Sequence, residues 1–112
     1  MNLQLTITTT NTIENFNISE YLDLISTHVV VGTNIFSDFG ASITDVFGGK
    51  SGTYQKKLAK MNEDAISQLR AKAIAINADA IVGLKLDFNE IAGKGKSMFM
   101  VSAVGTAVRL SK

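Results

Sequence analysis

The chain contains no cysteine, no proline and no tryptophan among its 112 residues. The absence of cysteine excludes a disulfide framework and any thiolate metal site. The absence of proline leaves every backbone amide available as a donor, so long strands and helices can run without interruption. The absence of tryptophan disfavours a flavin carrier, which needs exposed aromatic rings to stack on the isoalloxazine.

Long hydrophobic runs are absent too. Aliphatic stretches such as 29–31 and 73–76 are far too short to span a membrane. The N-terminal segment, MNLQLTITTTN, has neither the basic region nor the apolar core of a secretory signal, so we expect a cytoplasmic protein with no membrane partner. Hydrophobic residues make up 46% and charged residues 19%, which is typical of a globular chain, and we expect a single domain over 1–112.

The net charge of +1 conceals a strong asymmetry along the chain. Residues 1–49 hold five acids and no lysine or arginine, a charge of −5, whereas residues 50–112 hold eleven bases and five acids, a charge of +6. Nucleic-acid binding is disfavoured because Glu63 and Asp64 interrupt the bases and no aromatic platform accompanies them. We expect the two halves to attract one another, within one subunit or across a head-to-tail interface.

Alternation of apolar and polar residues predicts four strands, at 3–7, 17–31, 82–88 and 97–110, with a turn at Asn11. Residues 92–96 form a predicted hairpin loop. The second strand carries one apolar face, formed by Tyr21, Ile25, Thr27, Val29 and Val31. The third has one predicted buried face, formed by Val82, Leu84, Leu86 and Phe88.

Two helices are predicted between the second and third strands. The shorter one spans 34–47, has an apolar stripe about 120° wide and stops at Gly48-Gly49. The longer one spans 54–76, is capped by 51–53, and ends where Asn77 can adopt a left-handed cap. Its apolar stripe steps by three or four residues through Tyr54, Leu58, Met61, Ala65, Leu69, Ala73 and Ile76.

The last strand is apolar on both faces. One face holds Met98, Met100, Val104 and Val108; the other holds Phe99, Val101, Ala103 and Ala107. The long helix can cover one face, and a neighbouring subunit is the simplest cover for the other. The predicted fold is therefore α+β, with two layers: an antiparallel sheet packed on one long helix, plus one shorter helix.

Three runs of sequence carry a family resemblance: VVVGTNIFSDFGASITDVFGGKSGTYQKKL, ADAIVGLKLDF and SMFMVSAVGTAV. Together they resemble the YbjQ-like family, a group of unknown function labelled as heavy-metal-binding, over residues 18–109. The resemblance implies a small subunit similar in build to a dodecin subunit, a homopentameric ring, and no established catalytic activity. Residues that match the family pattern are Asn34, Asp38, Asp45, Tyr54, Asp79, Gly83 and Gly105.

The chain departs from that pattern at three positions. The family commonly has arginine where Ser37 and Lys50 stand, and an acid where Gln55 stands. Lysine does not reproduce the forked geometry of arginine, so these changes put in doubt any site that relied on a bidentate arginine.

The candidate ligand-binding residues are Asn34, Asp38, Asp45 and Tyr54. The first three fall within about 40° of arc on the shorter helix, opposite its apolar stripe. Carboxylate and amide oxygens there suit a hard cation or a cationic ligand. The alternative is a solvated or subunit-facing polar stripe. Asp38 and Asp45 stand roughly 10 Å apart along the helix axis, so they could share one ion only with help from elsewhere.

The soft donors of the chain are one histidine and four methionines. His28 is interpreted as a strand residue near a subunit edge, with a ligand or proton-sensing role as the alternative. Met98 and Met100 share a strand face, and thioethers could bind Cu(I), but methionine more commonly fills core gaps. We therefore expect soft heavy metals to bind weakly and without defined stoichiometry.

The functional hypothesis is a non-catalytic homo-oligomer that binds a small ligand or metal ion at its subunit interfaces. No particular cofactor is indicated by the sequence. The alternative hypothesis is an enzyme with an interface active site, in which Asp38 or Asp45 acts as acid or base.

Overall fold

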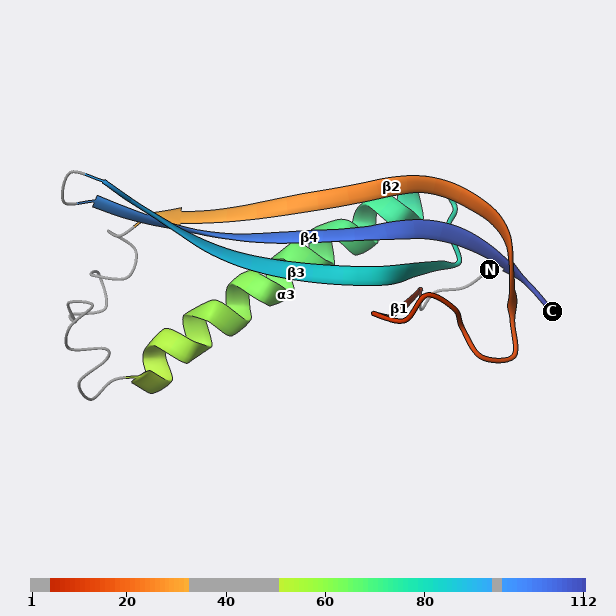
Figure 1. The fold of residues 1–112 in the computed structure, drawn as a ribbon, viewed down its shortest axis with the longest axis horizontal. Helices are drawn as coiled ribbons and strands as arrows, with labels where there is room; N and C mark the ends of the chain where they lie inside the picture. Colours follow the sequence, from red (N-terminus) through yellow and green to blue (C-terminus); the bar gives the residue numbers. More distant parts are fainter. Residues whose placement is uncertain (1–4, 33–50, 94–95) are drawn as a thin grey trace.

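The computed structural model describes residues 5–32, 51–93 and 96–112. Side chains are described for these residues except 51–54, 91–93 and 96–97. The elements, labelled in Figure 1, are β1 (Thr6–Ile7), β2 (Asn17–Gly32), α3 (Ser51–Ala75), β3 (Ala80–Gly93) and β4 (Lys96–Ser111). The predicted shorter helix at 34–47 lies outside the described residues.

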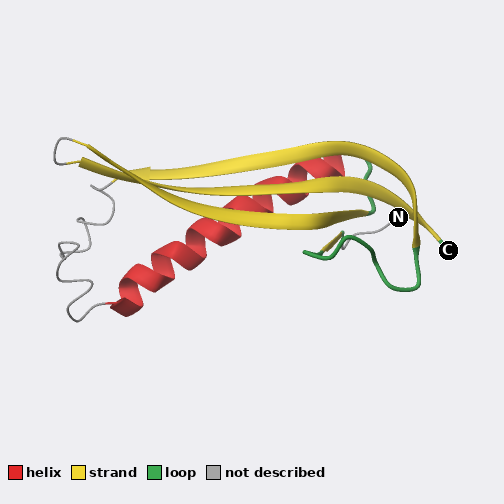
Figure 2. Cartoon of the chain, in the orientation of Figure 1, coloured by secondary structure: helices red, strands yellow, loops and turns green. Residues whose placement is uncertain are grey.

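The sheet has the strand order β1-β3-β4-β2. β4 pairs antiparallel with both β2 and β3, but β1 pairs parallel with β3, so the sheet is mixed and the prediction of an antiparallel sheet is wrong at this edge. The reason is the route of the chain: the green loop after β1 in Figure 2 leads to β2 at the opposite edge of the sheet. β1 therefore makes no hairpin with its neighbour in sequence, and hairpin geometry does not impose an antiparallel direction.

α3 crosses one face of the sheet diagonally, and in Figure 1 the three long strands lie in front of it. Met61, Ala65, Leu69 and Ala73 are buried, which confirms the middle of the predicted stripe of the long helix. The prediction is wrong at Ile76, which lies after the end of α3 and is 38% exposed. The four buried residues share one core cluster with the helix-facing residues of β4, which are Phe99, Val101, Ala103 and Ala107. Helix and sheet come close because alanine occupies several of these contact positions.

The sequence-based prediction is wrong at the start of α3 and correct at its end. The helix begins at Ser51, so 51–53 are helical and the prediction that they cap a helix starting at Tyr54 is wrong. Glycine and hydroxyl residues are tolerated there because first-turn amides have no intrahelical partner. At the other end Asn77 has φ 64°, which confirms the left-handed cap. The amides of Asn77 and Ala78 donate to the carbonyls of Ile74 and Ala73, at 3.0 Å each, which is a Schellman motif.

Two of the three register shifts in the described sheet change which face the predicted side chains occupy. The shift between Tyr21 and Asp23 turns Tyr21 outward, so it is 70% exposed and does not share the buried face of Ile25 and Thr27. The second shift lies between Val82 and Lys85, where Gly83 adopts φ 65°. A one-residue slip reverses which face each side chain occupies, which single-strand alternation cannot reveal.

The shift in β3 overturns the predicted face of that strand. Val82 packs in a small cluster with Ala80 and Val108, whereas Leu84 packs against the main core. Phe88 stacks on the buried Phe99, with ring centroids 5.8 Å apart, and is itself 46% exposed. On the helix-facing side of β3, Leu86 and Phe88 are thus partly exposed in the described part of the chain.

Candidate functional site

The predicted ligand-binding residues mostly fall beyond the described part of the chain. Asn34, Asp38 and Asp45 lie outside it. The backbone of Tyr54 is in the first turns of α3, but its side chain is also outside the described residues. The oxygen-donor pocket therefore stays a prediction, and the site described below is a different one.

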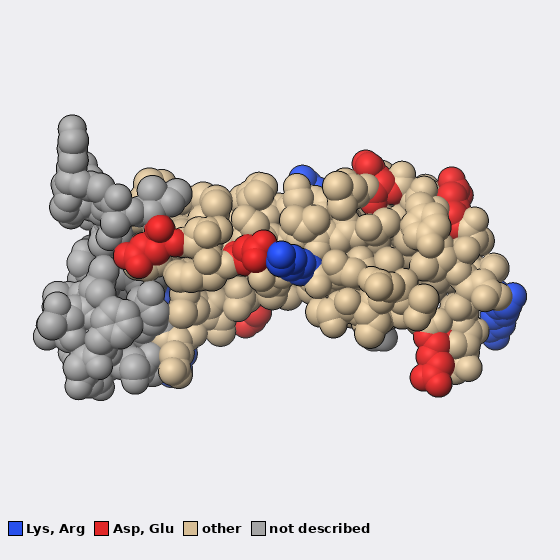
Figure 3. All heavy atoms as spheres, viewed as in Figure 1, with Lys and Arg blue, Asp and Glu red and all other residues tan. Residues whose placement is uncertain are grey.

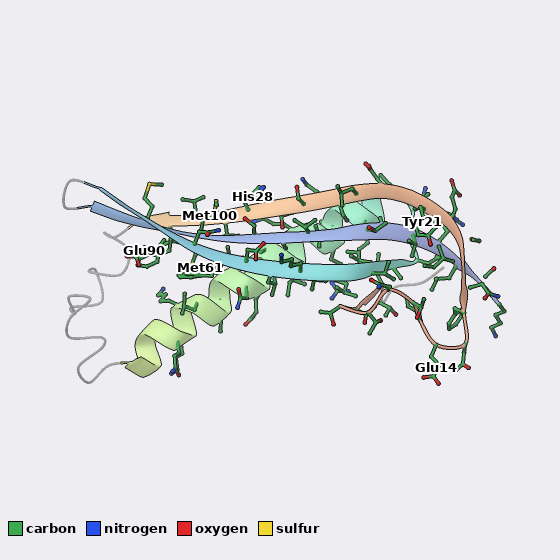
Figure 4. The ribbon with its side chains drawn as sticks, viewed as in Figure 1. Glu14, Tyr21, His28, Met61, Glu90 and Met100 are labelled. Atoms are coloured by element: carbon green, nitrogen blue, oxygen red, sulfur yellow. The ribbon has the colours of Figure 1, made fainter. Side chains whose placement is uncertain are left out.

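A polar row crosses the face of the sheet that points away from α3. Ser102 on β4 stands opposite His28 on β2 and opposite Asp87 on β3. The Nδ1 atom of His28 and the Oγ atom of Ser102 lie 2.9 Å apart in a hydrogen bond, while His28 itself is exposed (Figure 4). His28 is thus a residue of an edge strand, held by the central strand, and its Nε2 atom is the other ring nitrogen available to a partner.

The order of this row does not match a catalytic triad. In a Ser-His-Asp triad the histidine bridges the serine and the carboxylate. Here the serine stands in the middle, and Asp87 is separated from His28 by the whole of β4, about 10 Å at the usual strand spacing. Asp87 therefore cannot orient the histidine that contacts Ser102, and the row lacks the third member of a triad.

Sequence reasoning singled out His28 but missed Ser102 and Asp87. A signal for Ser102 was present, because a lone hydroxyl interrupts the apolar row of Met100 and Val104 on the same strand face. Asp87 carried no signal of its own, since an acid alternating with Leu86 and Phe88 is what a solvated strand face shows.

The methionines divide between two environments. Met61 is buried in the main core, where it fills space beneath the sheet. Met98 and Met100 lie on the face away from α3, opposite Gly32 and Val30 of β2. Within the described residues, no group of three or more His, Cys, Asp or Glu side chains is close enough to hold a metal ion.

The face away from α3 is apolar around its polar row. We name it the open face and define it by Leu24, Ser26, His28, Val30, Met98, Met100, Ser102 and Val104. Three of its large apolar side chains are well exposed: Leu24 at 69%, Val30 at 51% and Met98 at 43%. Figure 3, viewed from this side, shows a largely uncharged middle with only scattered acids and bases.

One end of this face is covered by the chain itself. Val108 is fully buried with Ala80 and Val82, and Ile13 from the loop after β1 packs against them, together with Ile18 and Leu110. The cover that we expected from a neighbouring subunit is therefore supplied locally at this end. From Leu24 to Val30 the described residues provide no such cover.

The basic residues of the second half serve mainly as structural ties where they are described. Arg70 donates to the carbonyl of Leu5 at 2.7 Å, and Lys72 donates to the carbonyl of Ser26 at 2.8 Å. The Lys60–Asp64 pair, at 3.1 Å, joins two residues of α3, and the hydrogen bond and charge of Asp64 raise the pKa of Lys60. This pair lies within the basic half, so it does not test the predicted attraction between the two halves.

Asp79, Gly83 and Gly105, which match the family pattern, have structural roles. Asp79 accepts a hydrogen bond from the amide of Leu110 at 2.9 Å and so fixes the end of β4. Gly83 supplies the left-handed backbone at the register shift. Gly105 faces Ile81, where a Cβ atom would meet the Ile81 Cγ2 atom at 2.5 Å.

Comparison with known proteins gives one consistent result. The YbjQ family model, described as "Putative heavy-metal-binding", matches residues 5–111. A UPF0145 protein of Pasteurella multocida is 45% identical over 102 residues, which is 91% of this chain and 95% of that protein. A UPF0145 protein of Geobacillus kaustophilus is 48% identical over 104 residues, 93% and 96% of the two chains.

A solved structure supports the fold. A protein of unknown function from Pediococcus pentosaceus, assigned to the DUF74 family, superposes with a TM-score of 0.67 at 18% identity. The match covers 96% of this chain and 98% of that one. In the described part of this chain, no helix has the length and apolar character needed to cross a membrane.

Proposed function

Because the chain belongs to the YbjQ family, we propose that it is a non-catalytic homo-oligomer, a homopentameric ring, that binds a small ligand or metal ion where its subunits meet. The family description names heavy metals, and the UPF0145 names of the relatives state no function. The proposal therefore draws its support from the surface of this chain rather than from a relative.

The observation that carries the proposal is the open face. Leu24, Val30 and Met98 present apolar side chains to solvent on one side of a long sheet, with the half-buried Met100 and Val104 between them. Exposed apolar side chains gathered on one face, here on both sides of the polar row, typically mark a site of association. A small domain such as this one also leaves much apolar surface outside its single core, which association can bury.

The absence of an assembled catalytic group in the polar row favours a binding role over an enzymatic one. The row holds a serine and a histidine in contact, but its carboxylate stands on the wrong side of the serine. The named relatives carry no enzyme name. No observation in the described residues favours the alternative in which Asp38 or Asp45 acts as acid or base.

The ligand site of this proposal is formed by Asn34, Asp38, Asp45 and Tyr54 at the interface. Oxygen donors on one stripe of the predicted shorter helix need further ligands to complete a coordination shell, and a neighbouring subunit can bring them. Such a site prefers a hard cation or a cationic organic group over a soft metal.

Native mass spectrometry of the protein purified from its own cells tests the proposal directly. We expect a complex of five subunits that retains a small mass, and we expect Asp38→Asn with Asp45→Asn to lose that mass while keeping five subunits. Sedimentation equilibrium at micromolar concentration that gives only the 12.0 kDa monomer would contradict the proposal.

A further inference from the structure

Both long edges of the sheet are unpaired in the part of the chain that the structure describes. β2 is the last strand of the order β1-β3-β4-β2, so none of its 16 residues pairs with a second strand on the outer side, although Lys72 of α3 donates to the carbonyl of Ser26. At the other edge, the segment around β1 pairs with β3 only as far as Leu84, whose amide donates to the carbonyl of Thr8 at 3.0 Å. The stretch from Lys85 to Gly93 pairs on one side only, with β4.

The β2 edge lacks the usual protections against pairing. Natural edge strands are kept short, interrupted by proline or bulges, or charged. Between Leu24 and Gly32 the edge has no proline, no Asp, Glu, Lys or Arg, and no register shift. An uncharged edge of this length pairs with unrelated chains unless a specific partner covers it.

The two edges are complementary on the helix side of the sheet. β2 presents Val29 and Val31 there, both half-buried against the main core. β3 presents Leu86 and Phe88 there, both partly exposed, with Phe88 stacked on Phe99 of the same core. If the two edges lie side by side, these apolar rows become neighbours and the core continues from one subunit into the next.

We infer that the β2 edge of one copy pairs with the Lys85–Gly93 edge of β3 in the next copy, so that the sheet continues from subunit to subunit. This inference rests on the proposed function and adds the two sheet edges to the open face as surface through which subunits meet. β2 and β3 both run antiparallel to β4, so copies related by rotation about an axis along the strands pair these edges in parallel. Such head-to-tail contacts use both free edges at once and close into a ring.

The competing occupant of the β2 edge is the β2 edge of another copy. A two-fold dimer of that kind pairs β2 with itself and leaves the Lys85–Gly93 edge of both copies open. It also leaves Leu86 and Phe88 partly exposed. Head-to-tail pairing is favoured because one contact covers both the unpaired β2 edge and the unpaired Lys85–Gly93 edge.

Disulfide trapping separates these arrangements, and the chain suits it because it has no native cysteine. Asp87→Cys is combined in turn with Ser26→Cys, His28→Cys or Val30→Cys. All four positions lie on the side of the sheet away from α3, and steps of two residues test three registers on one face. Two cysteines of one chain flank β4 at about 10 Å, beyond the ~7 Å limit for a disulfide.

After mild oxidation of the assembled protein with diamide, we expect at least one combination to give a ladder of covalent dimers and higher species on a non-reducing denaturing gel. Each single-cysteine variant, and a control pair of Asp87→Cys with Ser67→Cys on the exposed side of α3, should stay monomeric on the same gel. Native mass spectrometry of the reduced variants confirms that the subunit number is unchanged.

Two results would overturn the inference. A covalent dimer from a single cysteine on β2 shows that β2 pairs with itself. A stable oligomer with no ladder from any of the three combinations shows that subunits meet elsewhere, and it leaves the proposed function standing. A monomer under all conditions contradicts both.

Discussion

At the scale of single residues, the described structure assigns packing roles to Gly105, which the family resemblance had marked, and to Thr27, which it had not. Gly105 sits where β4 passes beneath α3, and its missing side chain leaves room for Ile81 and Leu69. Thr27 is buried on the neighbouring strand, where its hydroxyl donates to the carbonyl of Ala65 in α3 at 2.7 Å. Glycine at position 105 is therefore explained by the close packing of the helix on the sheet rather than by ligand binding.

We expect Gly105→Ala to destabilise the protein by about 1–3 kcal/mol, because the new methyl group overlaps the Ile81 side chain in a closed core. Urea denaturation at fixed protein concentration measures the change. Gly32→Ala is the matched control, since a Cβ atom there has no atom within 4 Å. Equal stability of the two variants would show that the core relaxes freely around position 105.

Soft metals should bind this chain weakly. His28, Met98 and Met100 lie on one strand-pair face, but they have no thiolate partner and the imidazole already bonds Ser102. Calorimetric titration with Cu(I), Zn²⁺ and Cd²⁺ should therefore give no sub-micromolar event of defined stoichiometry. One tight site per subunit that disappears in His28→Ala or Met100→Leu would reverse this expectation and support a heavy-metal role.

At the scale of elements, the helix and the last strand behave as their sequence periodicities indicate. Four-residue steps put Met61, Ala65, Leu69 and Ala73 in the core, and two-residue steps put Phe99, Val101 and Ala103 opposite them. The strand β3 behaves differently, because the left-handed Gly83 shifts its register against β4. The spacing of apolar residues within a segment predicts whether it is a helix or a strand. A single backbone irregularity can still change which face of the sheet its side chains occupy.

The cap at the end of α3 gives a test at this scale. Asn77→Val should destabilise the protein by roughly 1–2 kcal/mol, since a β-branched residue is strained at φ 64°. Asn77→Gly should be neutral or slightly stabilising, because glycine adopts this conformation without a steric penalty. Thermal unfolding followed by circular dichroism compares the two. A Val variant as stable as the Gly variant would mean that the helix end rearranges.

The buried face of β4 gives a second test. Ala103→Glu or Val101→Glu places a carboxylate without a partner where the wild-type side chains are fully buried, at a cost of several kcal/mol, on the order expected for an unpaired buried charge. We expect loss of folding or assembly by circular dichroism and size-exclusion chromatography. Ala71→Glu on the exposed side of α3 makes the same chemical change and should be tolerated.

At the scale of the whole molecule, the two faces of the sheet are covered unevenly by the rest of the chain. α3 protects one side of the sheet, the loop after β1 protects one end of the other side, and the described residues leave the rest of that side open. The sheet also ends in two long unpaired edges. Association through these surfaces follows from what one copy leaves exposed, not from any single residue.

Leu24→Lys and Val30→Lys test that association without touching the core, because both side chains are more than half exposed in one copy. We expect each variant to keep its secondary structure and to sediment as smaller species than the wild type, since a charge would have to be desolvated at the interface. Ser67→Lys, which introduces the same charge on the exposed side of α3, is the control. Unchanged subunit number in both variants would exclude the Leu24–Val30 region from the interface.

The sequence by itself determined the elements: the long helix, its left-handed cap at Asn77, and a last strand with two apolar faces. These features follow from the spacing of apolar and polar residues within one segment. Side chains that share a face recur every three or four residues in a helix and every two residues in a strand. The tertiary structure alone decided that β1 runs parallel to β3, that Tyr21 turns outward, and that Ser102 meets His28. Each of these depends on a partner strand or on its register, and such pairings between distant segments leave no period in the sequence of either one.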